Sequence, residues 1–243
     1  MPSYIFALTA NAGLAITFPS AIIWVDALHA YKAPGYSTVT PEIWNAVTRD
    51  PDYVGKELAG PDAIAFSHCH IDHFTSDIVR EASALWPNAA LMLPEKYFPD
   101  QIYVSGHKHT VNVNDVELKF IRTHHSTKRH HDKVHYSLLL KSNGTNIFIP
   151  ADSSMSDSAM HHYAVNTDID IAIVDYSWAM LSRGREIIEN DLKPKHLIVY
   201  HLPFTEDDAF GHRKLVDDGI KEISSVDDIR VMGERFQKEI ITV

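Results

Sequence analysis

Short apolar segments separated by polar turns make up the first part of the chain. Runs rich in Ile, Val, Leu and Phe that stop at Gly, Pro or Asn are typical of β-strands. This pattern predicts strands at residues 4–8, 14–18, 21–25, 62–66, 89–93, 111–113, 116–122, 134–140 and 146–150. Residues 75–86 differ, because their apolar positions recur at helical spacing and Pro87 follows. They predict an amphipathic helix that ends before the proline.

The last third of the chain alternates predicted strands with predicted helices. Strands at 169–174 and 196–200 alternate with helices at 185–191 and 206–218, and a short strand closes the sequence. Many strands first and strand–helix alternation later indicate a layered α/β or α+β fold. Because no internal repeat or Gly/Ser-rich linker interrupts the chain, we expect a single domain over residues 1–243. A polar stretch at 31–61, with short helices at 42–47 and 53–58, is a candidate lid.

Residues with metal-binding side chains follow four of the predicted strands. In layered α/β sheets, sites form outside the carboxyl ends of the strands, so residues far apart in the sequence converge there. The residues are His68, His70, Asp72 and His73 after 62–66, His124 and His125 after 116–122, Asp152 after 146–150, and His201 after 196–200.

The densest group is the sequence His-Cys-His-Ile-Asp-His at residues 68–73. A regular strand sends neighbouring side chains to opposite faces, so these ligands cannot all bind one ion from a strand. A loop that leads into a helix can present His68 and His70 to one ion, and Asp72 and His73 to another. Imidazole nitrogens and carboxylate oxygens suit zinc, manganese or iron, and the lack of thiolates argues against a Cys-rich structural zinc site.

Composition narrows the class of protein further. The 243 residues are 45% hydrophobic and 22% charged, which excludes disordered, collagen-like and coiled-coil chains. The formal net charge of −10 disfavours general nucleic-acid binding, because an acidic surface repels phosphates. The chain has 16 His and one Cys, so it is rich in metal ligands and has no disulfide framework. Residues 1–25 lack a positive segment and contain turn residues, so we expect a cytoplasmic protein without a membrane segment.

The motif at 68–73 and the later polar residues together resemble the metallo-β-lactamase superfamily. The motif is similar to the family's HxHxDH signature, and His125, Asp152 and His201 follow in the family's order. Asp26, after an apolar strand, fits the first family motif, so the resemblance covers nearly the whole chain. It implies a four-layer αββα sandwich with a two-metal site on its edge. The pattern is similar to the lactonase and phosphodiesterase branches, those akin to ascorbate-6-phosphate lactonase and ribonuclease Z.

The resemblance also implies a role for each ligand. One ion would be held by His68, His70 and His125, the second by Asp72, His73 and His201, and Asp152 would bridge them. The ions would be two divalent metals, Zn²⁺ first, with Mn²⁺ or iron as alternatives. A hydroxide between them would be the nucleophile. Asp72 and Asp152 would be the catalytic carboxylates, the first to accept or relay a proton and the second to fix the distance between the metals.

These roles predict a hydrolase that cleaves a small ester, lactone or phosphoester, anionic substrates included. The loop 128–133 is either a solvated hairpin tip or a segment that recognises phosphate or carboxylate. The alternatives are a metal-dependent ribonuclease or phosphodiesterase acting on nucleic acid, and a non-enzymatic scaffold that binds metal. Oxygen or nitric oxide reduction on iron needs an attached flavin-type carrier, for which 243 residues leave no room. The expected partner is a small molecule, and a homo-oligomer is left open.

Two features depart from the family pattern. Antibiotic-hydrolysing members usually carry Cys where Asp152 stands, so β-lactam hydrolysis is disfavoured. His135 and Tyr136 replace a Gly that is common before the next strand. This replacement leaves the substrate side of the site unassigned.

Two of the ligand assignments keep an alternative. Either His124 or His125 faces the site, because neighbouring side chains point in opposite directions. His125 is preferred because a small polar residue follows it, and His124 would then contact a ligand or the substrate. Asp152 is preferred as a bridging ligand, and its alternative role is to cap a helix at 153–160.

The remaining polar residues near the motifs receive supporting roles. Asp26 is predicted to orient a ligand, and Asp175 either orients a ligand or caps a helix. Cys69 points away from the metals and packs against the protein. His196 opens its strand and therefore lies at the wrong end for a ligand, which favours His201.

Overall fold

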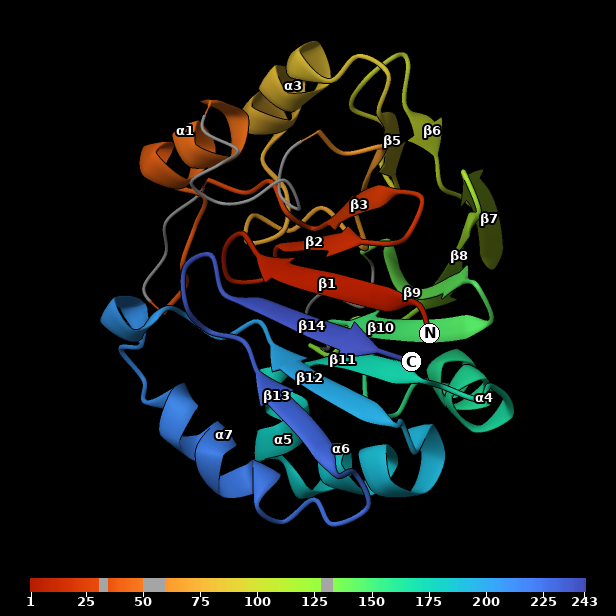
Figure 1. The fold of residues 1–243 in the computed structure, drawn as a ribbon, viewed down its shortest axis with the longest axis vertical. Coiled ribbons are helices and arrows are strands. Elements are labelled where there is room, and N and C mark those ends of the chain that lie inside the picture. Colours follow the sequence, from red (N-terminus) through yellow and green to blue (C-terminus); the bar gives the residue numbers. More distant parts are fainter. Residues whose placement is uncertain (31–34, 50–59, 128–132) are drawn as a thin grey trace.

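Two seven-stranded β-sheets pack face to face, with helices on their outer sides (Figure 1). The structure, a computed structural model, describes residues 1–30, 35–49, 60–127 and 133–243. The helix predicted at 53–58 and most of the loop 128–133 lie outside the described residues. The layers confirm the predicted αββα sandwich.

The first sheet carries the motif of residues 68–73 at one of its edges. Its strands, in spatial order, are β14 (Lys238–Thr242), β1 (Ser3–Leu8), β2 (Leu14–Thr17), β3 (Ile22–Val25), β4 (Ala63–Ala65), β5 (Ala90–Leu93) and β6 (Ile102–Tyr103). Strands β3 to β6 run parallel. Their carboxyl ends therefore lie at the same edge, which places Asp26 after β3 beside the motif after β4.

The second sheet brings the carboxyl ends of four strands and the amino end of a fifth to the site. Its strands, in spatial order, are β13 (Asp228–Val231), β12 (His196–Tyr200), β11 (Ile171–Asp175), β10 (Thr145–Ala151), β9 (His135–Ser142), β8 (Val116–Thr123) and β7 (Lys108–Val113). Strands β10 to β13 are parallel, and β9 is antiparallel to both β8 and β10. The carboxyl ends of β8, β10, β11 and β12 and the amino end of β9 therefore share one edge.

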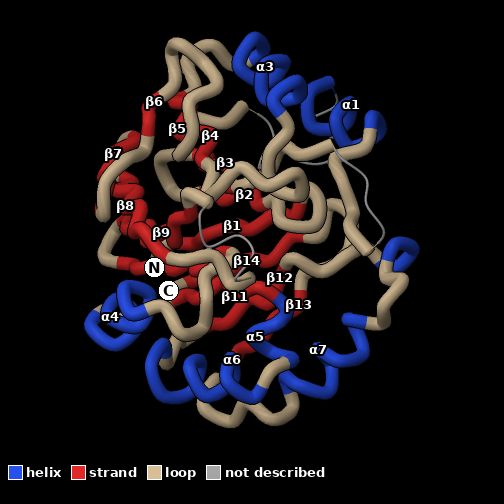
Figure 2. The backbone as a smooth tube through the Cα atoms, turned by 180° about the vertical axis from the view of Figure 1, so that it is seen from behind, coloured by secondary structure: helices blue, strands red, loops and turns tan. Residues whose placement is uncertain are grey.

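Helices cover the outer face of each sheet (Figure 2). The first sheet is covered by α1 (Pro41–Arg49) and α3 (Ser76–Leu85), and the second by α4 (Ser158–Asn166), α5 (Tyr176–Met180), α6 (Ser182–Ile187) and α7 (His212–Ile220). The short helices η3 (Ile188–Leu192) and η4 (Thr205–Asp207) complete the described elements. No helix of the described residues has both the length and the apolar character needed to cross a membrane.

The central strands of the second sheet are apolar on both faces because both of their faces are buried. In β9, Leu138 and Leu140 point into the core between the two sheets, whereas Leu139 packs under the helices with Met160 of α4. Successive residues of a strand alternate between its faces, so a continuous apolar run fits a strand that lies between two layers. This rigid double layer holds the strand ends that form the site.

The structure differs from the predicted elements mainly near the C-terminus. The helix predicted at 206–218 is replaced by η4 and α7, which begins only at His212. The Asp208 carboxylate accepts hydrogen bonds from the backbone N–H groups of His212, at 2.9 Å, and Arg213, at 3.1 Å. Gly211 has a φ of +69°, which interrupts the helix before this point. The pattern of apolar residues alone does not reveal such a break.

Three further elements differ from the prediction. The strand predicted at 111–113 is the end of the longer β7, which begins with polar residues, and β6, which was not predicted, has only two residues. The helix considered at 153–160 begins at Ser158 and is capped by Asp157, whose Oδ1 accepts from the Met160 N–H at 2.9 Å. Asp152 therefore does not cap this helix.

Candidate metal centre

Three strand ends at the shared edge contain a residue in the left-handed backbone region. Asp26 has a φ of 52°, Ala151 a φ of 51°, and His201 a φ of 67°. Such conformations cost about 1–3 kcal/mol each in residues other than glycine, and they cluster at functional sites. Here they turn the chain sharply after β3, before Asp152 and after β12, and backbone strain is concentrated at the place where the polar residues gather.

Three histidines form the first half-site, which we define as His68, His70 and His125. The ligand atoms of these side chains all lie within 4.8 Å of one another. His68 Nε2 is 3.1 Å from His70 Nδ1. His68 and His70 follow β4 of the first sheet and His125 follows β8 of the second, so this half-site joins the two sheets.

The second half-site consists of Asp72, His73 and His201, whose ligand atoms also lie within 4.8 Å of one another. Asp72 Oδ2 is 3.8 Å from His73 Nε2 and 3.7 Å from His201 Nε2. A tight turn in the motif loop, in which the His73 and Phe74 N–H groups donate to the His70 carbonyl, directs His70 and His73 to different half-sites.

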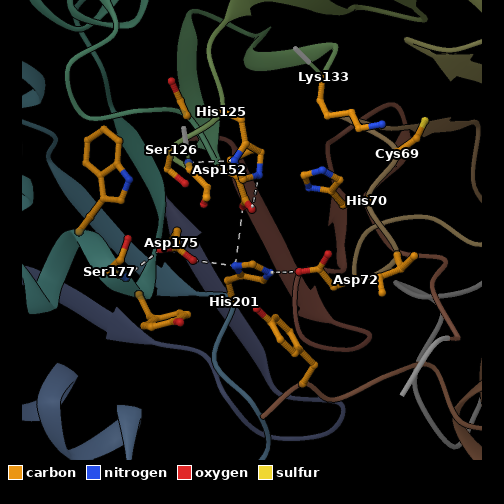
Figure 3. Close-up of a pocket in the computed structure, with 17 residues that line it drawn as sticks. Cys69, His70, Asp72, His125, Ser126, Lys133, Asp152, Asp175, Ser177 and His201 are labelled. Carbon is orange, nitrogen blue, oxygen red and sulfur yellow. Dashed lines mark hydrogen bonds and ion pairs between the residues drawn. The ribbon is translucent and has the colours of Figure 1, made fainter. Parts of the chain in front are cut away.

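Asp152 lies between the two half-sites, and each of its oxygens faces one of them (Figure 3). Oδ2 is 3.3 Å from His125 Nε2 and 3.9 Å from His68 Nε2. Oδ1 is 3.5 Å from His73 Nε2 and 3.8 Å from His201 Nδ1. This arrangement fits a carboxylate that would bridge two metal ions, one in each half-site.

Hydrogen bonds behind the site fix the proton position on His68. The Ser67 hydroxyl donates to Asp26 Oδ2 at 2.6 Å, so its oxygen accepts from His68 Nδ1–H at 2.9 Å. The lone pair of His68 therefore lies on Nε2, which faces the other ligands. Asp26 also lies 3.2 Å from His73 Nδ1, as expected for a carboxylate that orients a ligand.

Asp175 does the same for His201 and also caps a helix. Its Oδ2 accepts from His201 Nδ1–H at 2.6 Å, and its Oδ1 accepts from the Ser177 N–H at 2.8 Å at the start of α5. The two roles considered for Asp175 thus occur together, one on each oxygen. His201 thereby directs its Nε2 toward the second half-site.

The buried carboxylates change the proton affinity of their neighbours. Burial opposes protonation of His73, but Asp152, Asp72 and Asp26 outweigh it and raise the His73 pKa to about 10. Burial likewise opposes protonation of His201, whose pKa is held well above its usual value by Asp152 and Asp175. In return, His73 and His201 overcome the burial of Asp152 and hold its pKa well below the usual value. The site thus requires positive charge, supplied by protons or by cations.

The donor set fits two divalent ions. Within the described residues, His73 Nε2, His201 Nε2 and Asp152 Oδ1 are buried and have no hydrogen-bond partner. Buried polar atoms are almost always partnered, so such orphans indicate a missing ion or water. Imidazole and carboxylate donors without thiolates suit zinc, manganese or iron.

The structure distinguishes between the two adjacent histidines. The His125 side chain is buried in the first half-site. The His124 side chain is 68% exposed, and its Nδ1 is 2.7 Å from Asp157 Oδ2. His196 lies at the other end of β12 and contacts Asp228 at 2.7 Å. The structure thus brings the seven predicted ligands together, while their binding of metal stays a prediction.

A cavity of about 620 Å³ opens over the two half-sites. Lys133 and Cys69 lie on the side of His70, and Ser177 lies on the opposite side near Asp175 (Figure 3). Tyr36 and Tyr176 also line the cavity. Cys69 is half-buried, and burial raises the pKa of its thiol, so it stays a neutral thiol.

Two buried histidines next to the centre have no role predicted from the sequence. His29 and His135 are both 0% exposed, and burial lowers the pKa of each to about 3. His135 is the first residue of a strand, whereas the predicted ligands all follow the end of a strand. His29 carried no motif, and only the tertiary structure shows its place near the second half-site.

Solved structures with a similar architecture identify the fold. No protein-family model matches the sequence, and no curated protein matches it significantly. The metallo-β-lactamase fold protein YhfI from Bacillus subtilis superposes with a TM-score of 0.66 at 14% identity, covering 98% of this chain and 99% of that one. The chain has the metallo-β-lactamase fold.

Two further structures share this fold over nearly the whole chain. Igni18, a metallo hydrolase from the archaeon Ignicoccus hospitalis KIN4/I, has a TM-score of 0.64 at 13% identity, covering 99% of each chain. CmlA, a diiron β-hydroxylase from Streptomyces venezuelae, has a TM-score of 0.66 at 12% identity, and the match covers 99% of this chain but 54% of CmlA. At these identities the likeness shows the metallo-β-lactamase fold alone.

Asp175→Asn tests the orientation of His201. The amide keeps an oxygen for the Ser177 N–H but removes the negative charge from His201 Nδ1–H. We expect the affinity for one Zn²⁺ to fall by about tenfold to a hundredfold, as for other residues that orient a ligand. Competition with a chromophoric chelator measures this affinity, and Asp100→Asn, at an exposed position, is the control. Unchanged affinities for both ions would contradict the orienting role.

Proposed function

We propose that this chain is a hydrolase with two divalent metal ions, most simply Zn²⁺, that cleaves small ester, lactone or phosphoester substrates. The observation that carries the proposal is Asp152, whose two oxygens face two separate groups of ligands beneath the cavity. A single ion would need only one of these groups. The metallo hydrolase Igni18, which shares the fold, supports the same reaction class.

Two bound ions would lower the pKa of a water molecule and stabilise the negative charge that develops during hydrolysis. The chain's own residues hold and orient the centre: Asp26 orients His73 directly and His68 through Ser67, and Asp175 orients His201. His68, His73 and His201 are buried, which keeps bulk water away from their side chains. Asp72, which lines the cavity, would accept or relay a proton from the reacting water.

Two tyrosines provide neutral hydrogen-bond donors on the substrate side. Burial and the Asp72 and Asp152 carboxylates raise the pKa of Tyr36, and burial together with Asp175 raises that of Tyr176. Both hydroxyls therefore keep their protons at neutral pH. Tyr176 stacks on His212 at 4.7 Å, and the backbone next to Tyr36 is anchored by Ser37, whose hydroxyl donates to Asp207 at 2.8 Å.

The charge of the cavity favours a small anionic substrate. Lys133 is the only lysine or arginine among the described residues that line the cavity. A single ammonium group can bind one phosphate or carboxylate, whereas a nucleic-acid groove needs a row of cations. The net charge of −10 also disfavours a long polyanion. We therefore propose a small-molecule substrate and keep cleavage of RNA as the alternative.

A panel of three substrates tests the proposed function. The neutral ester p-nitrophenyl acetate, the lactone dihydrocoumarin and the monoanionic bis(p-nitrophenyl) phosphate represent the three bond types. We expect the Zn²⁺-loaded protein to hydrolyse at least one of them, and chelation to abolish and Zn²⁺ to restore the activity. Protein with both ions bound that hydrolyses none of the three would contradict the proposal, and faster cleavage of a single-stranded RNA would favour the alternative.

Lys133→Ala tests the preference for anions. A hydrogen bond to a charged group contributes about 1.5–3 kcal/mol, and the exposure of Lys133 reduces this value. We expect the inhibition constant of inorganic phosphate to rise by several-fold, while the kcat for p-nitrophenyl acetate stays unchanged. Lys96→Ala, at an exposed position away from the cavity, is the matched control. An unchanged inhibition constant would exclude Lys133 as the anion-binding group.

A further inference from the structure

His135 occupies the place where the two sheets meet behind the first half-site. It is the first residue of β9 and pairs with Thr123, the last residue of β8. Its neighbour Tyr136 donates a backbone hydrogen bond of 3.0 Å to the carbonyl of Ser67, directly before the metal-binding motif. His135 is 0% exposed and does not line the cavity, so it cannot touch a substrate.

The imidazole of His135 contacts two of the predicted ligands at once. Its ring centroid is 4.9 Å from that of His68 and 5.7 Å from that of His125. The His68 and His125 rings are themselves 5.2 Å apart. The three rings form a triangle in which His68 comes from the first sheet and the other two from the second. The position of His135 therefore sets how closely the ligands from the two sheets approach.

A chain of hydrogen bonds across three strands fixes the orientation of this ring. The Ser137 hydroxyl donates to the Pro150 carbonyl at 3.0 Å, so the Ser137 oxygen can only accept from Thr123, 3.3 Å away. The Thr123 hydroxyl therefore donates its proton to Ser137, and its oxygen accepts from His135 Nδ1–H at 2.8 Å. A similar chain of hydrogen bonds, through Ser67 and Asp26, fixes the position of the proton on His68. His135 thus has its proton on Nδ1 and its lone pair on Nε2.

A purely structural role does not explain a histidine at this position. Within the described residues, His135 Nε2 is buried without a hydrogen-bond partner, which a phenylalanine or leucine would avoid.

We propose that His135 is a positioning residue of the first half-site. Its hydrogen bond to Thr123 holds the ring against His68 and His125 and keeps their nitrogens at the spacing for one ion. The inference rests on the proposed two-metal centre and assigns no contact between His135 and the substrate.

Thr123→Val and His135→Phe test this role. Valine has the shape of threonine but cannot accept from Nδ1–H, and phenylalanine keeps a ring without that donor. Each variant is expected to bind one of the two Zn²⁺ ions about tenfold to a hundredfold more weakly, as when other residues that orient a ligand are changed. The double variant should have the same Zn²⁺ affinity as the single variant that binds Zn²⁺ more weakly. Both substitutions remove the same hydrogen bond, between Thr123 and His135, so their effects do not add. Thr145→Val is the matched control, because Thr145 is also buried but lies at the amino end of β10, opposite to the end that precedes Asp152.

Two readouts separate positioning from a loss of stability. Competition with a chromophoric chelator gives the two Zn²⁺ affinities, and the visible spectrum of the Co²⁺-loaded protein reports the ligand geometry. The spectrum should change in Thr123→Val and not in Thr145→Val. Thermal unfolding of each metal-free variant establishes that it folds, and if His135→Phe does not fold, Thr123→Val decides the question.

The outcomes distinguish this inference from the proposed function. If the wild-type protein binds two ions and folded Thr123→Val binds both with unchanged affinity and spectrum, the positioning role of His135 is wrong and the proposed function stands. If the wild-type protein itself binds no ion, the proposed function fails and the positioning role fails with it. Selective weakening of one ion in Thr123→Val supports both.

Discussion

A half-buried carboxylate between two groups of histidines determines the charge balance of the candidate site. Asp152 is surrounded by His68, His125, His73 and His201, and Asp72 adds a second negative charge nearby. Burying carboxylates is costly unless positive charge neutralises them. His73 and His201 can supply it as protonated imidazoles, because the surrounding carboxylates raise their pKa values. Divalent ions would supply it more strongly, and these protons would then leave as the ions bind.

The fold is arranged so that neither sheet holds the centre alone. The motif loop after β4 belongs to the first sheet, whereas His125, Asp152 and His201 follow strands of the second. The core between the sheets and the backbone bond from Tyr136 to Ser67 hold these edges together. Ions bound across both sheets would therefore stabilise the folded state, because the unfolded chain lacks the assembled site.

The sequence predicted the layers and the place of the site, but not the residues that support it. Apolar strands with His or Asp directly after them can be recognised locally, because alternation and parallel packing bring their ends together. The break before α7 depends on Asp208 and Gly211, and the role of His135 depends on Thr123 and Ser137 in neighbouring strands. Such features follow from contacts between elements, which the spacing of residues along the chain does not encode.

Metal content per chain, measured by elemental analysis on the wild-type protein and on Asp152→Ala, tests the bridged centre most directly. A carboxylate shared by two ions predicts about two equivalents of zinc, manganese or iron in the wild type, and one or fewer in the variant. Two equivalents in both proteins would show that Asp152 does not bridge. One equivalent in both would mean a mononuclear site, and would contradict the two-metal centre on which the proposed hydrolysis depends.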